Sequence, residues 1–425
     1  MTQIITQYVV IALLVGAGLY LSLLCYFVFR QRRLVEQVAE ASLSRFSAEV
    51  ALLREKNHQQ RIKNELAWNR FRKFRIARKE SENSDICSIY LTPNDNRPLQ
   101  SFLPGQYLTL KLNIPGNKQS VTRCYSLSDS CFRQDYYRLT IKRIPAPRDH
   151  PELSPGLSSN FLHDSLHPGD TIDLKAPSGN FYLDTDSEDP VVLIGGGVGI
   201  TPVLSMLNTI TQSGSKRETW FFYGVRNSDE HIMKGHLMKA AAEHENVHVV
   251  ICYSDPKPED MLGQDYHHGE RVSVELMKSV LPHSDFDFYL CGPPPMMKSI
   301  VNDLQEGGIN TKRIHFEAFG PASVKQVVEA TSHPSDVQES HAFDIRFARS
   351  DKTVTWDKRF SSLLECAEEN DIIMDSGCRA GNCGTCESVL IEGDIDYIQE
   401  RGAECQKRGF LSCISIPRSN LVVDA

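Results

Sequence analysis

The sequence predicts a multi-domain chain with an N-terminal transmembrane helix, an antiparallel β-barrel, an α/β domain with a parallel sheet, and a small α+β domain. Three observations predict it: an uncharged apolar run near the start, short apolar runs between turn residues, and a buried strand entering a glycine-rich turn and a helix. The 425 residues suffice for several cores. We expect a transmembrane helix at 8–29, a helical stalk at 31–68, the barrel at 69–184, the α/β domain at 185–320, a polar linker at 321–340 and the α+β domain at 341–425.

The apolar run at residues 8–29 contains no charge, and its 22 residues in helical form would cover the ~30 Å hydrocarbon core of a bilayer. No basic residue precedes the run, whereas Arg30, Arg32 and Arg33 follow it. This asymmetry favours a single-pass protein of the cell inner membrane with its catalytic domains on the cytoplasmic side, and it disfavours a cleaved signal peptide. A buried core helix is the alternative.

Four cysteines near the C-terminus follow the spacing C-x4-C-x2-C with a distant fourth member, which is the plant-type arrangement for a [2Fe–2S] cluster. Zinc sites usually pair ligands as C-x2-C, so a zinc loop or a disulfide knot is the weaker alternative. Glycines in the same loop allow backbone N–H groups to approach sulfur. The other eight cysteines are scattered, as in a reducing compartment. The predicted cluster ligands are Cys378, Cys383, Cys386 and Cys413.

Charge is unevenly distributed along the chain. Residues 1–80 hold 14 basic and 6 acidic residues, whereas the last 85 hold 15 acidic and 10 basic residues within a formal net charge of -8. An acidic cluster domain favours a basic protein partner and a fast, salt-sensitive encounter. The same charge argues against nucleic acid as a partner.

In the barrel region, apolar runs at 85–93, 105–116, 136–145 and 168–183 alternate with turn signals. Two motifs lie within this region, R-x-Y-S and, later, G-x-x-S-x-x-L, and together they can hold a flavin. An Arg and a Tyr that merely pack on a strand are the alternative for the first motif alone. In the flavin interpretation Arg123 neutralises a diphosphate, Tyr125 stacks on the ring, Ser126 reaches flavin N5, and Ser159 takes phosphate at a helix start.

The α/β domain begins with a buried strand at 191–194 that enters a glycine-rich turn and then a helix, the context in which dinucleotide phosphates bind. Further strands are expected at 220–224, 247–252 and 286–290. The last of these ends in C-G-P-P, at the sheet edge where ligands collect. A tight connection without a ligand is the alternative for the turn alone. The expected nucleotide-binding residues are Gly195, Gly196, Gly197, Val198, Gly199, Ile200, Thr201 and Pro202, with Cys291 and Gly292.

These motifs resemble the ferredoxin–NADP reductase superfamily followed by a plant-type ferredoxin, over residues 69–425. The run GLSSNFLHDSLHPGDTIDLKAPSGNFYL with GGGVGITP looks most like the reductase half of flavohaemoglobins. The domain order is similar to fused reductases that feed oxygenases or hybrid-cluster protein. The resemblance implies a β-grasp fold for the C-terminal domain. Because the predicted anchor stands where a globin would precede the reductase, haem dioxygenase activity is not implied.

Carried over to this sequence, the resemblance implies FAD rather than FMN, and hydride transfer from nicotinamide C4 to flavin N5. Cys291 would lie beside the nicotinamide as a soft contact, and Glu317 would place the ring or shuttle protons. The implied catalytic residues are Tyr125, Ser126, Cys291 and Glu317, and the implied FAD contacts are Tyr107, Arg123, Tyr125, Ser126, Ser159 and Phe319.

The choice between NADH and NADPH depends on residues after the second strand. Arg226 and Ser228 could meet a 2′-phosphate, whereas Asp229 and Glu230 would repel it, which favours NADH. We therefore expect a membrane-anchored oxidoreductase that moves electrons from NAD(P)H through FAD and [2Fe–2S] to a separate one-electron acceptor, such as an oxygenase, hydroxylase or desaturase component in the same membrane. A respiratory-type dehydrogenase reducing quinone or a membrane complex, and a relay subunit with a degenerate flavin half, are the alternatives.

Overall fold

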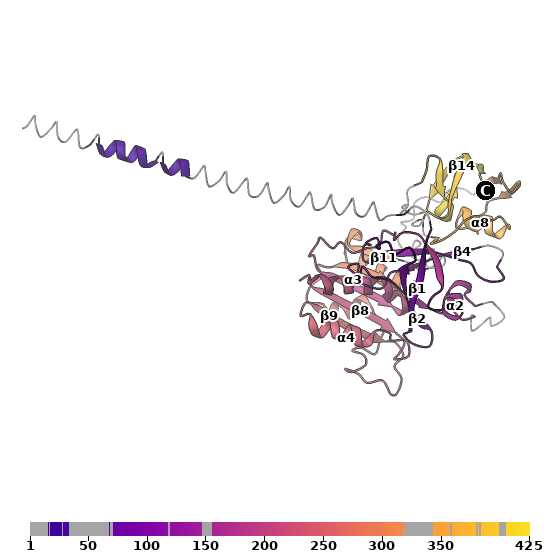
Figure 1. Cartoon of the computed structure of the whole chain (residues 1–425), viewed down its shortest axis with the longest axis horizontal. Coiled ribbons are helices and arrows are strands. Elements are labelled where there is room, and N and C mark those ends of the chain that lie inside the picture. The colour runs from indigo at the N-terminus through magenta and orange to yellow at the C-terminus, as the bar shows by residue number, and fades with distance from the viewer. Residues whose placement is uncertain are drawn as a thin grey trace, which may run out of the picture. The chain divides into compact units, whose positions relative to one another are not determined.

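The structure is a computed structural model in two units, Met1–Leu66 and Ala67–Ala425, which we describe separately (Figure 1). It describes residues 16, 18–27, 29–33, 68, 71–117, 120–146, 155–317, 319, 343–357, 359–379, 381, 384–398 and 405–425.

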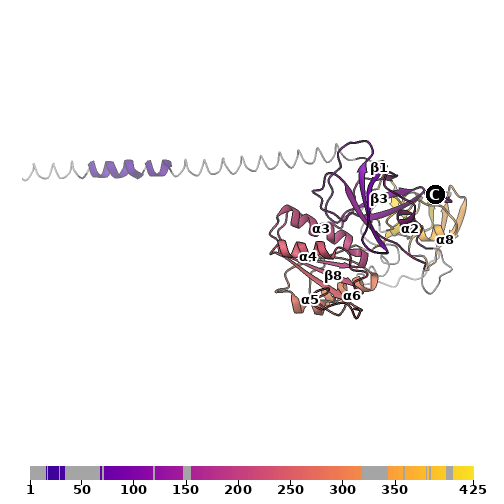
Figure 2. The ribbon, with the colours of Figure 1, turned by 60° about the horizontal axis from the view of Figure 1, so that its bottom comes forward.

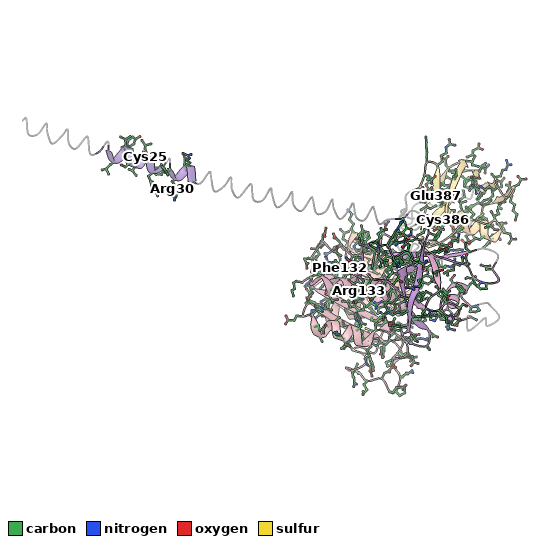
Figure 3. The ribbon with its side chains drawn as sticks, in the orientation of Figure 1. Cys25, Arg30, Phe132, Arg133, Cys386 and Glu387 are labelled. Carbon is green, nitrogen blue, oxygen red and sulfur yellow. The ribbon has the colours of Figure 1, made fainter. Side chains whose placement is uncertain are left out.

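The described part of the first unit is helical, and its large apolar side chains are exposed. Figure 3 labels two of its side chains, Cys25 and Arg30. Within the residues that the structure describes, none of the helices combines the length and the apolar character that crossing a bilayer requires. Residues 8–15, 17 and 28 of the predicted span lie outside the described residues, as do 34–67 of the predicted stalk and the whole predicted linker.

The second unit opens with an antiparallel six-stranded sheet in the order β4-β3-β6-β1-β2-β5. A bridge between Leu127, just after β4, and Leu139 in β5 joins the two ends of this order, so the sheet closes as the predicted barrel. Stacked Phe74 and Tyr137 rings, 5.7 Å apart, help to fill the interior. The elements are β1 (Arg72–Ser81), β2 (Ile86–Pro93), β3 (Tyr107–Leu112), β4 (Val121–Ser126), β5 (Tyr137–Lys142), α2 (Leu157–Asp164) and β6 (Thr171–Leu174).

The next part is a parallel five-stranded sheet in the order β11-β10-β7-β8-β9, as the α/β prediction expects. Figure 2 shows α3 and α4 on one face of the sheet and α5 and α6 on the other. The elements are β7 (Val191–Gly196), α3 (Ile200–Ser213), β8 (Thr219–Val225), α4 (Lys234–Glu243), β9 (Val247–Tyr253), α5 (Val274–Val280), β10 (Asp287–Cys291), α6 (Pro294–Glu306) and β11 (Ile314–Glu317).

Burial on both faces explains why β7 is a continuous apolar run. Val191 and Leu193 pack into the core under α3 and α4, while Val192 and Ile194 pack into the core under α5 and α6. The chain leaves β7 toward β8 on one side and returns to β10 on the other, so the strand order reverses between β7 and β10. In open parallel sheets, the carboxyl ends of the strands at such a reversal form the ligand crevice.

The C-terminal part is a five-stranded sheet, ordered β13-β12-β18-β14-β16, with a separate β15-β17 pair. The neighbours β12 and β18 are parallel, and α8 packs on the sheet through Leu363, Cys366 and Ala367. The sequence pattern predicts a hairpin at 343–356 and a helix at 361–370, and both are present as β12–β13 and α8. The topology agrees with the expected β-grasp class. The elements are β12 (Asp344–Phe347), β13 (Lys352–Thr355), α8 (Leu363–Glu369), β14 (Glu387–Glu392), β15 (Ile395–Tyr397), β16 (Gly409–Leu411), β17 (Ser415–Pro417) and β18 (Leu421–Val423).

Candidate active site

Three of the predicted flavin contacts lie on strand β4, on both of its faces. Arg123 and Tyr125 are two residues apart, so they lie on one face of the strand, while Ser126 at its end is buried and pairs in register with Tyr107 of β3. Burial lowers the pKa of Arg123 and raises the pKa of Tyr125. The face therefore offers a guanidinium and a neutral aromatic ring, which suit a diphosphate and a flat ring system.

Ser159 lies in the first turn of α2 and is buried. Its hydroxyl accepts a hydrogen bond from the Ile144 backbone N–H at 3.3 Å and donates to the Gly156 carbonyl at 3.3 Å. These bonds fix the start of α2 against the end of the barrel strand β5. Ser159 thus orients the helix N-terminus, whose dipole favours phosphate.

Three of the four predicted catalytic residues come together from distant parts of the chain. Cys291 at the end of β10 pairs in register with Glu317 at the end of β11. The Ser126 hydroxyl, from the barrel, donates to Glu317 Oε2 at 3.1 Å. Tyr125 precedes Ser126 on β4. A hydroxyl, a thiol and a carboxyl thus line the junction between the barrel and the parallel sheet.

The electrostatics of this junction favour neutral side chains. Burial raises the pKa of Glu317 to about 8, although the hydrogen bond from Ser126 acts in the opposite direction. Burial, reinforced by the Glu317 carboxyl, raises the pKa of the fully buried Cys291 thiol well above its ordinary value. At neutral pH Glu317 therefore carries a proton, and Cys291 is a thiol that can act as a polarisable contact and not as a thiolate nucleophile.

Glycines allow the ends of β7 and β10 to meet closely. A Cβ on Gly199 would lie 2.4 Å from the carbonyl oxygen of Cys291, and one on Gly292 would lie 3.2 Å from the Gly196 Cα. Gly197 has a φ of +53° and open space around its Cβ position. The backbone at these strand ends is therefore not covered by side chains, which fits the close approach of a pyrophosphate. We call this surface, formed by Gly196, Gly197, Gly199 and Gly292, the glycine cradle.

The remaining residues of the predicted turn have two roles in the structure. Gly195 pairs with Cys291 in the sheet. Ile200, Thr201 and Pro202 are buried in the first turn of α3, where the Thr201 hydroxyl donates to the Val198 carbonyl at 3.1 Å. These four residues build and support the turn, whereas the glycines leave its backbone accessible.

Arg226, a predicted 2′-phosphate contact, is held by a neighbouring carboxylate. Its Nη2 and Nε donate to Glu230 Oε1 at 2.6 and 2.9 Å. Asp229 pairs with Lys257 at 2.7 Å. The positive charge after β8 is thus balanced by acids of the same loop, an environment that fits a 2′-hydroxyl better than a phosphate.

The cluster loop brings together sulfur atoms of the predicted ligands. Cys386 Sγ and Cys413 Sγ lie 3.0 Å apart, and the Gly381 N–H hydrogen-bonds the sulfur of Cys413. A disulfide would need about 2.05 Å. Cys383 lies outside the described residues, and among those described no three His, Cys, Asp or Glu side chains gather closely enough to hold a metal ion. The unbridged pair of cysteines and the backbone donor suit the chemistry of an iron–sulfur cluster.

Two further residues complete the site. Phe319, a predicted FAD contact, follows Glu317 by two positions, and its side chain is exposed. Lys175, which follows β6, donates to Thr385 Oγ1 in the cluster loop at 3.4 Å. Lys175 could not be expected from the sequence, because a lysine after a strand carries no signal of its own. A polar group centred on Asp129 was not expected either, and its signal is the pair of polar residues Ser205 and Asn208 within the apolar pattern of α3.

Three family models match consecutive parts of the chain. The oxidoreductase FAD-binding domain matches residues 73–182, the oxidoreductase NAD-binding domain matches 193–302, and the 2Fe-2S iron-sulfur cluster binding domain matches 345–418. The last match includes all four predicted ligand cysteines.

The chain is similar to a flavohemoprotein of Halalkalibacterium halodurans, at 42% identity over 255 residues, covering 60% of this chain and 61% of that protein. It spans about three-fifths of the length of the curated relatives it matches. The crystal structure of the flavohem-like FAD/NAD-binding domain of nitric oxide dioxygenase from Vibrio cholerae matches at 32% identity and a TM-score of 0.52, covering 60% of this chain and all of that one. Phthalate dioxygenase reductase matches at 26% identity and a TM-score of 0.52, covering 84% of this chain and 98% of that one.

Proposed function

We propose that this chain, which belongs to the family of NAD(P)H-dependent flavin and iron–sulfur reductases, oxidises NADH and delivers electrons singly to a separate acceptor protein. The observation that carries the proposal is the convergence of Ser126, Cys291 and Glu317 beside the glycine cradle, with a four-cysteine loop in the same chain. When bound, FAD exchanges a hydride with the nicotinamide and single electrons with the [2Fe–2S] cluster.

The protein's own residues bind and orient these groups. Arg123 neutralises the FAD diphosphate, Tyr125 covers one face of the ring, and the glycine cradle at the start of α3 binds the nicotinamide diphosphate. Ser126 and the protonated Glu317 form a hydrogen-bonded pair, in which the Ser126 hydroxyl donates to Glu317 Oε2 and the raised pKa keeps a proton on the Glu317 carboxyl. Cys291 excludes water from the buried end of β10.

NADH is the proposed donor because the loop after β8 has no surplus of positive charge. Arg226 is hydrogen-bonded to Glu230, and Lys142 Nζ also lies near the Glu230 carboxylate, at 3.8 Å. A 2′-phosphate would have to displace Glu230 from Arg226 while lying next to that carboxylate.

The proposed acceptor is an oxygenase, hydroxylase or desaturase component. Phthalate dioxygenase reductase has a modular structure for electron transfer from pyridine nucleotides to [2Fe-2S], and the match covers nearly all of that protein. The acidic cluster domain of the present chain adds an electrostatic argument for a basic docking face on the acceptor.

We further propose that the N-terminal segment anchors the chain to the inner membrane, with the catalytic domains in the cytoplasm. The uncharged sequence at 8–29, the arginines after it and the exposed apolar side chains of its described part support this. Replacing Leu19 with Arg would place a charge near mid-span, at a cost of about 2.5–3.5 kcal/mol. The full chain should stay with membranes in alkaline carbonate, and Leu19→Arg should be released; equal retention of both would contradict the anchor.

The enzymatic proposal is tested with the detergent-purified full chain. NADH should bleach the flavin faster than NADPH, and the protein should reduce both ferricyanide and cytochrome c. If bound flavin stays oxidised with both nucleotides, the protein is a relay subunit. If lipid-dependent quinone reduction proceeds without an added protein partner, the respiratory dehydrogenase alternative replaces the reductase proposal.

A further inference from the structure

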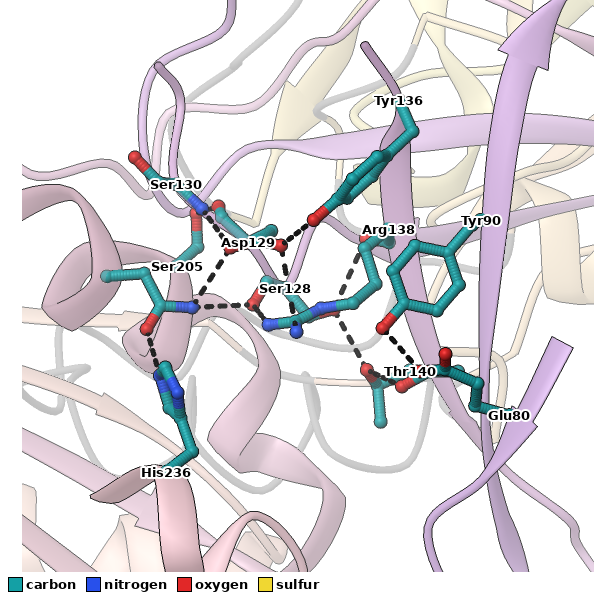
Figure 4. A network of polar contacts seen from close by, with 12 residues as sticks. Glu80, Tyr90, Ser128, Asp129, Ser130, Tyr136, Arg138, Thr140, Ser205 and His236 are labelled. Atoms are coloured by element: carbon teal, nitrogen blue, oxygen red, sulfur yellow. Dashed lines mark hydrogen bonds and ion pairs between the residues drawn. The ribbon is translucent and has the colours of Figure 1, made fainter. Parts of the chain in front are cut away.

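A buried network of polar side chains joins the barrel to the parallel α/β domain (Figure 4). The hydrogen-bonded residues are far apart in sequence, and each side of the network matches a different family model. From the barrel come Ser128, Asp129 and Arg138, and from the α/β domain come Ser205 and Asn208 of α3 and His236 of α4.

Asp129 is the centre of this network. Its carboxylate accepts hydrogen bonds from Tyr136 Oη at 2.8 Å, from the Ser130 backbone N–H at 2.8 Å and from Asn208 Nδ2 at 3.3 Å. Its backbone carbonyl accepts the Ser205 hydroxyl at 2.7 Å. The side chain of Arg138 lies 3.6 Å away and supplies the counter-charge. A buried carboxylate is tolerated only where such partners are held in place, so the network requires one relative placement of its two sides.

The partners of Asn208 extend the network deeper into the α/β domain. Asn208 Oδ1 lies 2.6 Å from His236 Nε2, and its Nδ2 also reaches the Ser128 carbonyl at 3.4 Å. Asn208 is buried in α3, where most of its buried neighbours along the helix are apolar. An amide there would be unfavourable without the barrel residues, which indicates that α3 is built to meet the barrel at this point.

The network lies close to both cofactor-binding elements along the chain. Asp129 follows Ser126, the last residue of β4, by three positions. Ser205 and Asn208 lie in the second and third turns of α3, which begins directly after the glycine turn. Any rotation of α3 against the barrel would therefore move the glycine cradle relative to the end of β4. Hydride transfer is sensitive to such movement, because reacting atoms must approach within about 3–3.5 Å.

We propose that Asp129 and Asn208 are positioning residues for hydride transfer, which set the placement of the glycine cradle against β4, the strand that carries the proposed flavin contacts. The inference rests on the proposed function and identifies residues that touch neither cofactor. It predicts that breaking the link slows the transfer step while leaving cofactor and nucleotide binding largely intact.

The network supplies its own matched control. Within the barrel, the Thr140 hydroxyl is hydrogen-bonded to the hydroxyls of Ser128 and Ser88, at 2.9 Å each. All three residues are buried. Thr140→Val removes these bonds without touching α3. Asn208→Leu removes the hydrogen bonds from Asn208 to Asp129 and Ser128 with a side chain of similar size, and Ser205→Ala is a milder variant should Asn208→Leu fold poorly.

The kinetic test follows flavin reduction by NADH in the anaerobic full chain, with 4-deuterated NADH to confirm that hydride transfer is observed. Asn208→Leu should lower the limiting rate by about ten- to a hundredfold with a nearly unchanged Kd for NADH, because misplacement by about 1 Å can cost that much. Ser205→Ala should lower it by about threefold and Thr140→Val by less than about twofold, in proportion to the contacts each removes across the interface. Equal slowing in Thr140→Val, or a wild-type limiting rate in Asn208→Leu, would overturn the inference.

A second readout needs no activity. The Cys131 backbone N–H donates to Thr209 Oγ1 of α3 at 3.1 Å, so its hydrogen exchange reports the contact between the barrel and α3. Exchange at Cys131 should accelerate in Asn208→Leu and not in Thr140→Val, and unchanged exchange in Asn208→Leu would contradict the role of the network. If NADH never reduces the wild-type flavin, the proposed function fails, while the exchange result still tests the placement of α3.

Discussion

Two glycine-rich turns of this molecule use glycine for different physical reasons. In the nucleotide turn, Gly199 has a φ of -64°, which any residue can adopt, and it is glycine because the Cys291 carbonyl leaves no space for a Cβ. In the cluster loop, Gly381 and Gly384 have φ values of +70° and +67°, which favour glycine whatever surrounds them. Gly199 is therefore specified by a tertiary contact, whereas the local path of the chain is enough to specify Gly381 and Gly384.

The cysteines of the same two regions show a parallel difference. Cys291 is a fully buried core residue at a strand end, and its chemistry depends on Glu317 and Ser126 from other strands. Cys386 lies just before β14 and Cys413 just after β16, and their sulfur atoms are 3.0 Å apart. Local spacing identifies the cluster ligands, whereas a residue such as Cys291 acquires a role only through its neighbours.

The largest effect is expected at the cluster. Cys413→Ser should abolish the visible absorption of the cluster and reduce cytochrome c turnover by about a hundredfold or more, because a thiolate ligand is lost. Ferricyanide reduction at the flavin should largely persist. Cys405→Ser is the matched control, since this thiol packs against the same small core but is outside the predicted ligand set. Equal loss of both activities in Cys413→Ser would contradict the proposed electron order.

Gly199→Ala tests the tertiary origin of the nucleotide turn. The added Cβ would force the ends of β7 and β10 apart, and we expect a loss of about 1–3 kcal/mol in the free energy of unfolding. Gly235→Ala is the control, because Gly235 lies in α4 with open space at its Cβ position, and it should be neutral or stabilising by up to about 1 kcal/mol. Urea unfolding measures both. Similar values for the two variants would remove the contrast between the glycine turns.

Glu317→Gln tests the proton held at the junction. The pKa of Glu317 is raised from the ordinary 4.5 to about 8, so between these values the folded state holds a proton that the unfolded state has lost. Stability from this group is therefore present at low pH and falls as pH rises toward 8. Thermal unfolding between pH 5 and 8 should show that slope in the wild type and less of it in the variant. The rate of flavin reduction by NADH should also lose its dependence on a group of pKa near 8, and an unchanged profile would exclude Glu317 from proton handling.

The smallest effect is expected at nucleotide choice. Glu230→Gln releases Arg226 and removes the nearest repulsive carboxylate, so kcat/KM for NADPH relative to NADH should rise by about two- to fivefold, as for a partly exposed charge pair. Glu259→Gln is the control, because Glu259 lies near Lys257 and not near Arg226. An unchanged preference would show that the loop after β8 does not set it.

Much of the fold could be predicted because its signals are local. The buried strand at 191–194, the hairpin near residue 344 and the helix near residue 363 are all confirmed, since apolar periodicity and turn residues act over short stretches. The domain boundaries and the membrane span stay predictions. Closure of the barrel through Leu127 and Leu139 could not be predicted, because strand periodicity does not state which edges meet.

By itself the sequence determined the cluster ligand pattern, the glycine-rich turn and the order of the domains, because spacing and composition along a chain carry that information. Only the tertiary structure decided that Ser126 meets Glu317 across 191 positions, that Gly199 lies against Cys291, and that Asp129 links the barrel to α3. The physical reason is that burial and desolvation, which give these groups their pKa values and their need for partners, arise only when distant segments exclude water together.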